Sequence, residues 1–419
     1  MISRKALKQQ FDALILHPLG KIQLDLPKSA SIVIVIDALD ECDREEDIRI
    51  IIRLLSQAQR IASVQLKFLL TSRPELPIRL GFEDIRGKYE GLTLHQIPES
   101  VVKEDISVFL EYELATIRDD YHKSIKSNRR HLPDNWPGHT NVQILVEMAF
   151  PLFIFAATVC RFIRDRRFGQ PDQQLAKVLK YQTKSQASKL DATYLPVLNQ
   201  LLIGVTGSEK QDIIEQFKQV VGSIVILASP LSATSLDQLL GVPQGTVDSR
   251  TDLLHSVLSI PSDPNQPIRV LHLSFRDFLV DPERCETNPF SVNENQTHQI
   301  IANCCIRLMS SSLKQNICGL ESPGILKTEV ASSRVDQFLP PEVKYACLYW
   351  IQHLQKSSTQ LKDYGQVHQF LQAHLIHWFE ALGWMGKTSE GIEAILSLEG
   401  YVLVSYLLFD RSLINLSLG

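Results

Sequence analysis

Acidic residues gather where an apolar run ends, early in the chain. The run from Ser31 to Ile36 is almost wholly β-branched, and Asp37, Asp40 and Glu41 follow it. Carboxylates at the end of a strand can hold Mg²⁺ and can order a water molecule, which are two of the tasks in phosphoryl transfer. The alternative is that these aspartates only start a helix, because Asp is favoured at the N-cap and in the first turn.

Two hydroxyls and a guanidinium follow a second apolar run. Val64–Leu70 leads directly into Thr71, Ser72 and Arg73. A guanidinium can neutralise the charge of a phosphate group, and the carboxyl ends of neighbouring parallel strands lie at one edge of a sheet. The sequence therefore predicts that Arg73 lies near the acidic residues that follow the first run.

The elements that position these residues are predicted from apolar spacing. Ile32–Ile36 is continuous and β-branched, which is typical of a strand buried on both faces of a parallel sheet. Apolar positions recur at helical spacing over Asp43–Ile61, and Leu66–Leu70 is the next strand, so the three segments form a βαβ unit. A short third strand is predicted at Gly91–Ile97 and an amphipathic helix at Glu99–Ile117. This order indicates an α/β fold with a parallel sheet.

Helical patterns dominate the rest of the chain. One or two buried helices are predicted over Asn141–Arg164, around Pro151. Helices at Thr234–Leu240 and Val247–Leu258 precede a short strand at Ile268–Leu273, and this order is a winged-helix pattern. The remaining segments are helical, at Gln296–Ser312, Pro341–Gln355, Gln366–Leu382 and Ser389–Leu398.

Composition excludes several classes of protein. The 419 residues are 44% hydrophobic and 21% charged, which is ordinary for a soluble protein of two or three domains. A net charge of −4 indicates neither nucleic-acid nor membrane binding, and no apolar run is long enough to cross a bilayer. The seven cysteines are scattered without a Cys-x-x-Cys pair, so we expect reduced thiols in a cytoplasmic protein. The stretch Leu236–Leu258 carries three aspartates and one arginine, which disfavours DNA binding by the winged helix.

Two segments resemble a known family. Ile32–Cys42 resembles the Walker B strand, and Phe68–Glu75 the sensor strand, of NACHT-type NTPases, which belong to the STAND class of signalling switches. The amino-acid sequences of both segments are similar to those of the NACHT proteins of filamentous fungi, although Ala38 stands where the family often has glycine. The resemblance implies a fold that begins as part of a P-loop NTPase and continues as mostly α domains, including the winged helix.

The same resemblance implies roles for the acidic and basic residues. Asp37 would hold Mg²⁺ through water, Asp40 and Glu41 would serve hydrolysis, and Arg73 would meet the γ-phosphate of ATP. ATP or ADP and Mg²⁺ would be the cofactors. The partners would be related NACHT proteins or a second copy of this chain, and neither nucleic acid nor a membrane.

The resemblance extends to two later segments. Glu147–Thr158 is similar to the small helical domain whose proline packs on adenine, a role that Pro151 would take. Val270–Leu279 resembles the end of the winged helix, where a histidine reaches the β-phosphate of ADP, a role that His272 would take. The alternatives are that Pro151 opens a core helix in its first turn and that His272 is a core residue of an apolar strand.

Four domains follow from this resemblance. Residues 1–130 would be a partial NACHT NTPase core, 131–190 a small helical domain, 191–285 a winged-helix domain and 286–419 a helical spacer domain.

The phosphate-binding loop of such NTPases is not found in the sequence. No Gly-x-x-x-x-Gly-Lys-Ser/Thr motif occurs in the 419 residues. Gln10–Leu19 is similar to the helix that follows this loop in fungal members, so we expect the loop to precede Met1, in an N-terminally truncated chain. Because the loop supplies most of the phosphate contacts, we expect this chain alone to bind and hydrolyse ATP inefficiently. The alternative function is a non-catalytic interaction module that associates with related full-length NACHT proteins.

Overall fold

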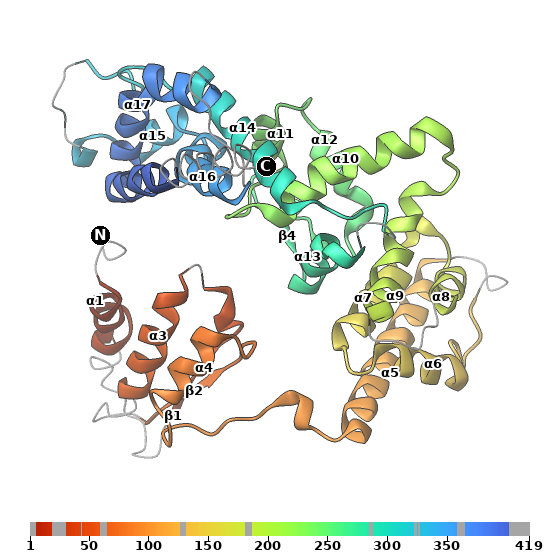
Figure 1. The fold of residues 1–419 in the computed structure, drawn as a ribbon. Coiled ribbons are helices and arrows are strands. Elements are labelled where there is room, and N and C mark those ends of the chain that lie inside the picture. The colour runs from red at the N-terminus through yellow and green to blue at the C-terminus, as the bar shows by residue number, and fades with distance from the viewer. Residues whose placement is uncertain are drawn as a thin grey trace, which may run out of the picture. The chain divides into compact units, whose positions relative to one another are not determined.

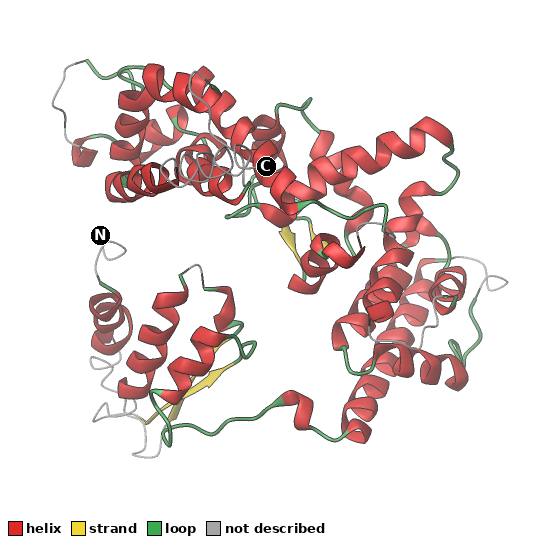
Figure 2. Cartoon of the chain, in the orientation of Figure 1, coloured by secondary structure: helices red, strands yellow, loops and turns green. Residues whose placement is uncertain are grey.

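The chain folds into two compact units, Met1–Ile97 and Pro98–Gly419, in a computed structural model. Each unit has hydrophobic clusters of its own. The residues that the structure describes are 6–18, 31–42, 44–58, 65–125, 131–180, 187–284, 288–321, 325, 327–357 and 365–401. Figure 1 traces the elements along the chain, and Figure 2 shows that helices dominate them.

The first unit contains the predicted parallel strand pair. Strands β1 (Ser31–Ile36) and β2 (Gln65–Leu70) pair in parallel, with Ile32 opposite Leu66 and Ile36 opposite Leu70. Helix α3 (Glu45–Ala58) connects them, which confirms the βαβ order. The flanking helices are α1 (Leu7–Phe11), which continues as a π-helical turn at Asp12–Leu16, and α4 (Leu76–Glu83).

Among the described residues, helices cover one face of this strand pair. Ile36 and Leu70 pack on the cluster formed by α3 and α4, whereas Val33, Val35 and Leu69 point to the other face and are 57%, 61% and 56% exposed. The prediction that the first strand is buried on both faces is therefore wrong for the described residues. An apolar run predicts burial on both faces, but burial requires a layer on each face, and residues of both α3 and α4 pack with Ile36 and Leu70 on the same one.

The predicted third strand is also wrong. Gly91–Ile97 contains a single 3₁₀ turn at Leu94–Gln96. The amide of Gln96 donates to the carbonyl of Thr93, and that of Ile97 donates to Leu94, so these backbone groups are satisfied within the turn and not across a strand ladder. The segment leads into α5 (Glu99–Ser124), which is longer than predicted.

The second unit opens with helices that share one core. The segment around Pro151 forms two helices, as the sequence allowed, α6 (His139–Ala149) and α7 (Phe153–Arg164). They are followed by α8 (Pro171–Leu179), α9 (Ala187–Leu198) and α10 (Gly207–Ile226). Both α6 and α7 pack against α5, and α7 also packs against α9.

A compact group of short elements follows α10. It consists of α11 (Ala233–Leu240), α12 (Thr246–Thr251), the antiparallel strands β3 (Leu258–Ser259) and β4 (Arg269–Val270), and α13 (Leu273–Val280). The order of two helices and a strand agrees with the sequence, but β4 is shorter than the predicted Ile268–Leu273 because α13 begins at Leu273. That this group is a winged helix remains a prediction.

The last part of the chain is helical, as predicted. Its helices are α14 (Glu294–Ser312), α15 (Ser332–Phe338), α16 (Pro341–Lys356), α17 (Gln366–Met385) and a helix at residues 388–401. The sequence missed α15. Within the described part of the chain, every helix is too short or too polar to cross a membrane.

Candidate functional site

The predicted acidic and basic residues meet at the carboxyl ends of β1 and β2. Pairing continues just past the strands, because the amide of Thr71 donates to the carbonyl of Ile36 at 3.0 Å and the amide of Leu39 donates to the carbonyl of Thr71 at 2.9 Å. These two bonds hold the turns that follow the strands side by side. We refer to Asp37, Asp40, Glu41, Thr71 and Arg73 as the strand-tip site.

The Thr71 hydroxyl organises the first turn of the strand-tip site. It accepts a hydrogen bond from the amide of Ala38 at 2.9 Å and donates one to the carboxylate of Asp37. Ala38 has a φ of 51°, a left-handed conformation that glycine adopts without steric cost. This conformation explains why glycine suits the position, and it turns the chain so that Asp37 and Asp40 lie on the same edge as Thr71 and Arg73.

Asp40 connects the two turns. Its carboxylate accepts a hydrogen bond from the Arg73 amide at 2.9 Å and lies 3.8 Å from the guanidinium Nε of Arg73. The Asp40 side chain is only 5% exposed, whereas that of Arg73 is 44% exposed. Asp37 and Glu41 are exposed. Asp40 is therefore a structural link as well as a candidate for chemistry.

The oxygen donors of the strand-tip site suit a hard cation. The Asp37 carboxylate and the Thr71 hydroxyl are of the kind that Mg²⁺ prefers. No group of three or more His, Cys, Asp or Glu side chains in the described residues could hold a metal ion. The Asp37 carboxylate, which is exposed, is thus a single candidate ligand for Mg²⁺ and not part of a protein cluster that could hold the ion.

The two remaining predicted residues lie in the second unit. Pro151 is exposed and follows a cis peptide bond in the turn between α6 and α7. Helix α7 begins only at Phe153, with Leu152 as its N-cap, so the alternative that Pro151 opens this helix in its first turn is wrong. The preceding Phe150 ring lies 5.3 Å from the ammonium group of Lys103.

His272 is the N-cap of α13 and is exposed. Its Nδ1 accepts a hydrogen bond from the backbone amide of Ser274 at 3.1 Å and lies 2.7 Å from the Ser274 hydroxyl. The Tyr194 hydroxyl, from α9, lies 2.7 Å from the same serine oxygen. The alternative that His272 is a core residue of a strand is therefore wrong.

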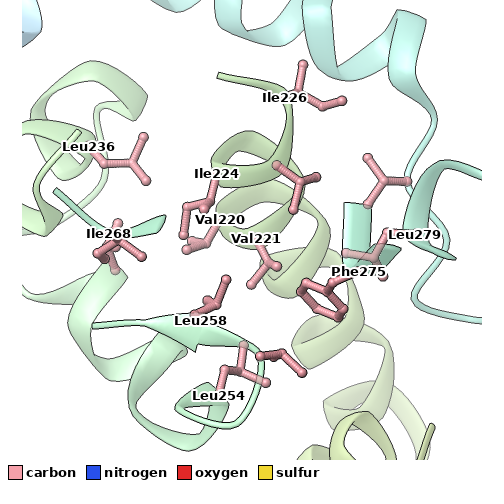
Figure 3. Packing of buried hydrophobic residues seen from close by; sticks show 14 of the residues in the cluster. Val220, Val221, Ile224, Ile226, Leu236, Leu254, Leu258, Ile268, Phe275 and Leu279 are labelled. Carbon is pink, nitrogen blue, oxygen red and sulfur yellow. The ribbon is translucent and has the colours of Figure 1, made fainter. Parts of the chain in front are cut away.

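The core beneath α13 fixes the position of His272. Phe275 and Leu279 of α13 are fully buried in a cluster that also contains Val221 of α10 and Leu258 of β3 (Figure 3). The Tyr194 ring also packs on this helix, with its centroid 5.1 Å from that of Phe275. Sequence reasoning missed Tyr194 and Ser274. The spacing of Ser274, two residues after a histidine at the start of a helix, could have indicated its contact with His272. Tyr194 is distant in the sequence, and no neighbouring residue indicates its contact.

A Gly-Lys-Thr tripeptide at residues 386–388 does not form a phosphate loop. Gly386 has a φ of 72° and ends α17, and the amide of Lys387 donates to the carbonyl of Leu382 at 2.8 Å. The Lys387 ammonium group contacts Glu390 at 2.6 Å. The backbone amides that a phosphate would need are thus used in a helix cap.

Comparisons with known proteins cover the strand-tip site. A family model described as "Nephrocystin 3, N-terminal" matches residues 2–73, which include every residue of this site. The chain is 25% identical over 388 residues to the vegetative incompatibility protein HET-E-1 of Podospora anserina. That alignment covers 87% of this chain and 26% of the relative, so the chain spans about a quarter of the relative's length. No solved structure matches the chain.

Proposed function

We propose that this chain, a NACHT-like protein similar to a fungal member of the STAND signalling class, carries part of a nucleotide-dependent oligomerisation switch. The observation that supports the proposal best is the strand-tip site. It brings an exposed carboxylate, Asp37, and a guanidinium, Arg73, to the same edge of a parallel strand pair. Phosphoryl transfer needs charge neutralisation and positioning at such an edge.

Each residue of the strand-tip site has a role in this proposal. Asp37 would contact hydrated Mg²⁺, with Thr71 holding its carboxylate in place, and the metal ion would neutralise the phosphate charge. The Arg73 guanidinium would leave its ion pair with Asp40 and contact an oxygen of the γ-phosphate. Asp40, once released from Arg73, would order water together with Glu41, so that the contact between Asp40 and Arg73 keeps the site inactive without ATP.

The remaining predictions complete the proposal. Pro151 would contact adenine and His272 a phosphate of ADP. The division at residues 1–130, 131–190, 191–285 and 286–419 is proposed for the domains.

Since the 419 residues contain no Gly-x-x-x-x-Gly-Lys-Ser/Thr motif, weak nucleotide binding by this chain alone is part of the proposal. Association with related NACHT proteins or a second copy, in the cytoplasm, would be the output.

Calorimetric titration of the 419-residue chain with ATP and with ADP, with and without Mg²⁺, tests this function. We expect binding that depends on Mg²⁺ and that Asp37→Ala abolishes. Glu90→Ala, which removes an exposed carboxylate outside the strand-tip site, should bind as the parent chain does. The absence of heat at millimolar nucleotide, from protein shown to be folded by circular dichroism, would exclude the nucleotide-dependent switch for this chain.

A second function is favoured by the exposed face of the strand pair. Val33, Val35 and Leu69 form an apolar patch on β1 and β2. A non-catalytic module that associates with related NACHT proteins through this patch would need no nucleotide. Association that is unchanged by ADP, Mg²⁺ and Asp37→Ala would favour this module over the switch.

A further inference from the structure

Two groups of Ser274 contact Nδ1 of His272, and the Tyr194 hydroxyl contacts one of them. The backbone amide of Ser274 donates to Nδ1 at 3.1 Å, and the Ser274 hydroxyl lies 2.7 Å from the same atom. The Tyr194 hydroxyl lies 2.7 Å from the Ser274 oxygen. A backbone amide can only donate, so Nδ1 must present a lone pair.

The direction of the whole chain of hydrogen bonds follows from that amide. If Nδ1 carried a proton and used it in a hydrogen bond to the Ser274 hydroxyl, this N–H would also lie against the N–H of the Ser274 backbone, and two donors repel each other. With Nδ1 as an acceptor, the serine hydroxyl donates to His272 and the tyrosine hydroxyl donates to Ser274. A neutral imidazole has one proton, which then resides on Nε2.

The surroundings of Tyr194 favour this direction. Its hydroxyl is a donor only while it keeps its proton, and burial raises the pKa of Tyr194 to about 12. The ring is held between Phe275 and Phe278, with centroids 5.1 and 5.2 Å away. Tyr194 is therefore a fixed donor on α9, aimed at the first turn of α13.

We propose that Tyr194 and Ser274 are positioning residues that hold His272 in the form with its proton on Nε2, so that its ligand is an anionic oxygen such as that of a phosphate. This inference rests on the proposed function, because it concerns the same histidine, and it specifies the chemistry of the ligand. A metal ion at Nε2 would need the lone pair there, which would move the ring proton to Nδ1 and against the Ser274 amide.

The proton position is measured first, without any ligand. Long-range ¹H–¹⁵N spectra of the histidine-labelled chain distinguish the two tautomers, and the His272→Gln spectrum assigns the signal among the 12 histidines. We expect the Nε2–H form in the parent chain, and a larger share of the Nδ1–H form in Ser274→Ala and Tyr194→Phe. Ser259→Ala and Tyr112→Phe, at exposed positions on β3 and α5, should leave the signal unchanged. An Nδ1–H or doubly protonated ring in the parent chain at pH 7.5 would overturn the inference.

The ligand class is then tested at the same signal. Titration with ADP or with pyrophosphate should shift the His272 resonance, and titration with Zn²⁺ should not. Ser274→Ala should weaken the binding by about threefold to tenfold, the effect of one hydrogen bond, and Tyr194→Phe by less. A shift with Zn²⁺ alone, or none with either phosphate, would overturn the ligand assignment. Binding of ADP that His272→Gln leaves unchanged would refute the proposed role of His272 in the switch, while the tautomer result would still stand.

Discussion

At the scale of single residues, the strand-tip site depends on one backbone conformation. Ala38 has a φ of 51°, and its amide donates to the Thr71 hydroxyl that also contacts Asp37. An L-residue with a side chain is disfavoured in this left-handed region, and glycine is not. The site therefore contains local strain that its own hydrogen bonds hold in place.

Ala38→Gly should stabilise the first unit. Glycine removes the steric cost of the left-handed conformation but adds conformational entropy to the unfolded chain, so we expect a net gain of about 0.5–1 kcal/mol in the free energy of unfolding. Urea denaturation measures it. Ala115→Gly, inside α5, is the matched control and should destabilise by about 1 kcal/mol. Destabilisation by Ala38→Gly would show that the alanine side chain contributes favourable contacts.

At the scale of elements, a hydrogen-bonded series joins the segment that follows α10 to α16 and α14. The Ala228 amide donates to the Tyr345 hydroxyl at 3.0 Å, and this hydroxyl lies 2.7 Å from His353 Nε2. His353 Nδ1 lies 2.7 Å from Nδ1 of His298 on α14. Only one proton fits between the two Nδ1 atoms, so at least one of the two rings is neutral. Burial lowers the pKa of His298 to about 4 and that of His353 to about 3.

Stability should therefore fall when the solution is acidified. The unfolded histidines bind protons below a pH of about 6.5, whereas the folded ones do so only near their lowered pKa values. The free energy of unfolding then decreases as the pH falls from about 6.5 toward 4, by up to about 1.4 kcal/mol per pH unit for each proton taken up on unfolding.

Urea denaturation at pH 7.5, 6 and 5 measures this effect. His298→Asn, which keeps an acceptor for His353, should lose less stability between pH 7.5 and 5 than the parent chain. His139→Asn, at an exposed histidine, should keep the parent dependence. The prediction fails if His298→Asn and the parent chain lose equal stability over this range.

At the scale of the whole molecule, the two units differ in the size of their hydrophobic clusters. The second unit has one large cluster that extends from α5 to the helix at residues 388–401. In the first unit, Val33, Val35 and Leu69 stay more than half exposed on the strand pair. Exposed apolar strands invite pairing with another chain.

We expect the 419-residue chain to self-associate through this patch. Light scattering over a range of concentrations should show a mass above 47.4 kDa, and Val35→Lys should lower it. Val108→Lys, which places the same charge at an exposed valine of α5, should leave the mass unchanged. A monodisperse monomer of the parent chain would contradict the prediction.

The sequence by itself determined most of the elements and the membership of the strand-tip site. The period of apolar residues is a local property, so most helices and the two strands could be located from it, and parallel pairing then places Asp40 and Arg73 at the same edge. The third strand, predicted at Gly91–Ile97 but not formed, shows the limit of this reasoning, because a strand needs a partner as well as a pattern.

Tertiary structure alone decided which faces are buried and which distant side chains meet. Val35 and Ile36 are equally apolar, yet only Ile36 contacts a helix layer. Tyr194 and Ser274 are 80 residues apart, and packing of α9 on α13 brings their hydroxyls to 2.7 Å. Residue type and spacing carry information about neighbours along the chain, whereas burial and proton position depend on groups that only the folded chain brings together.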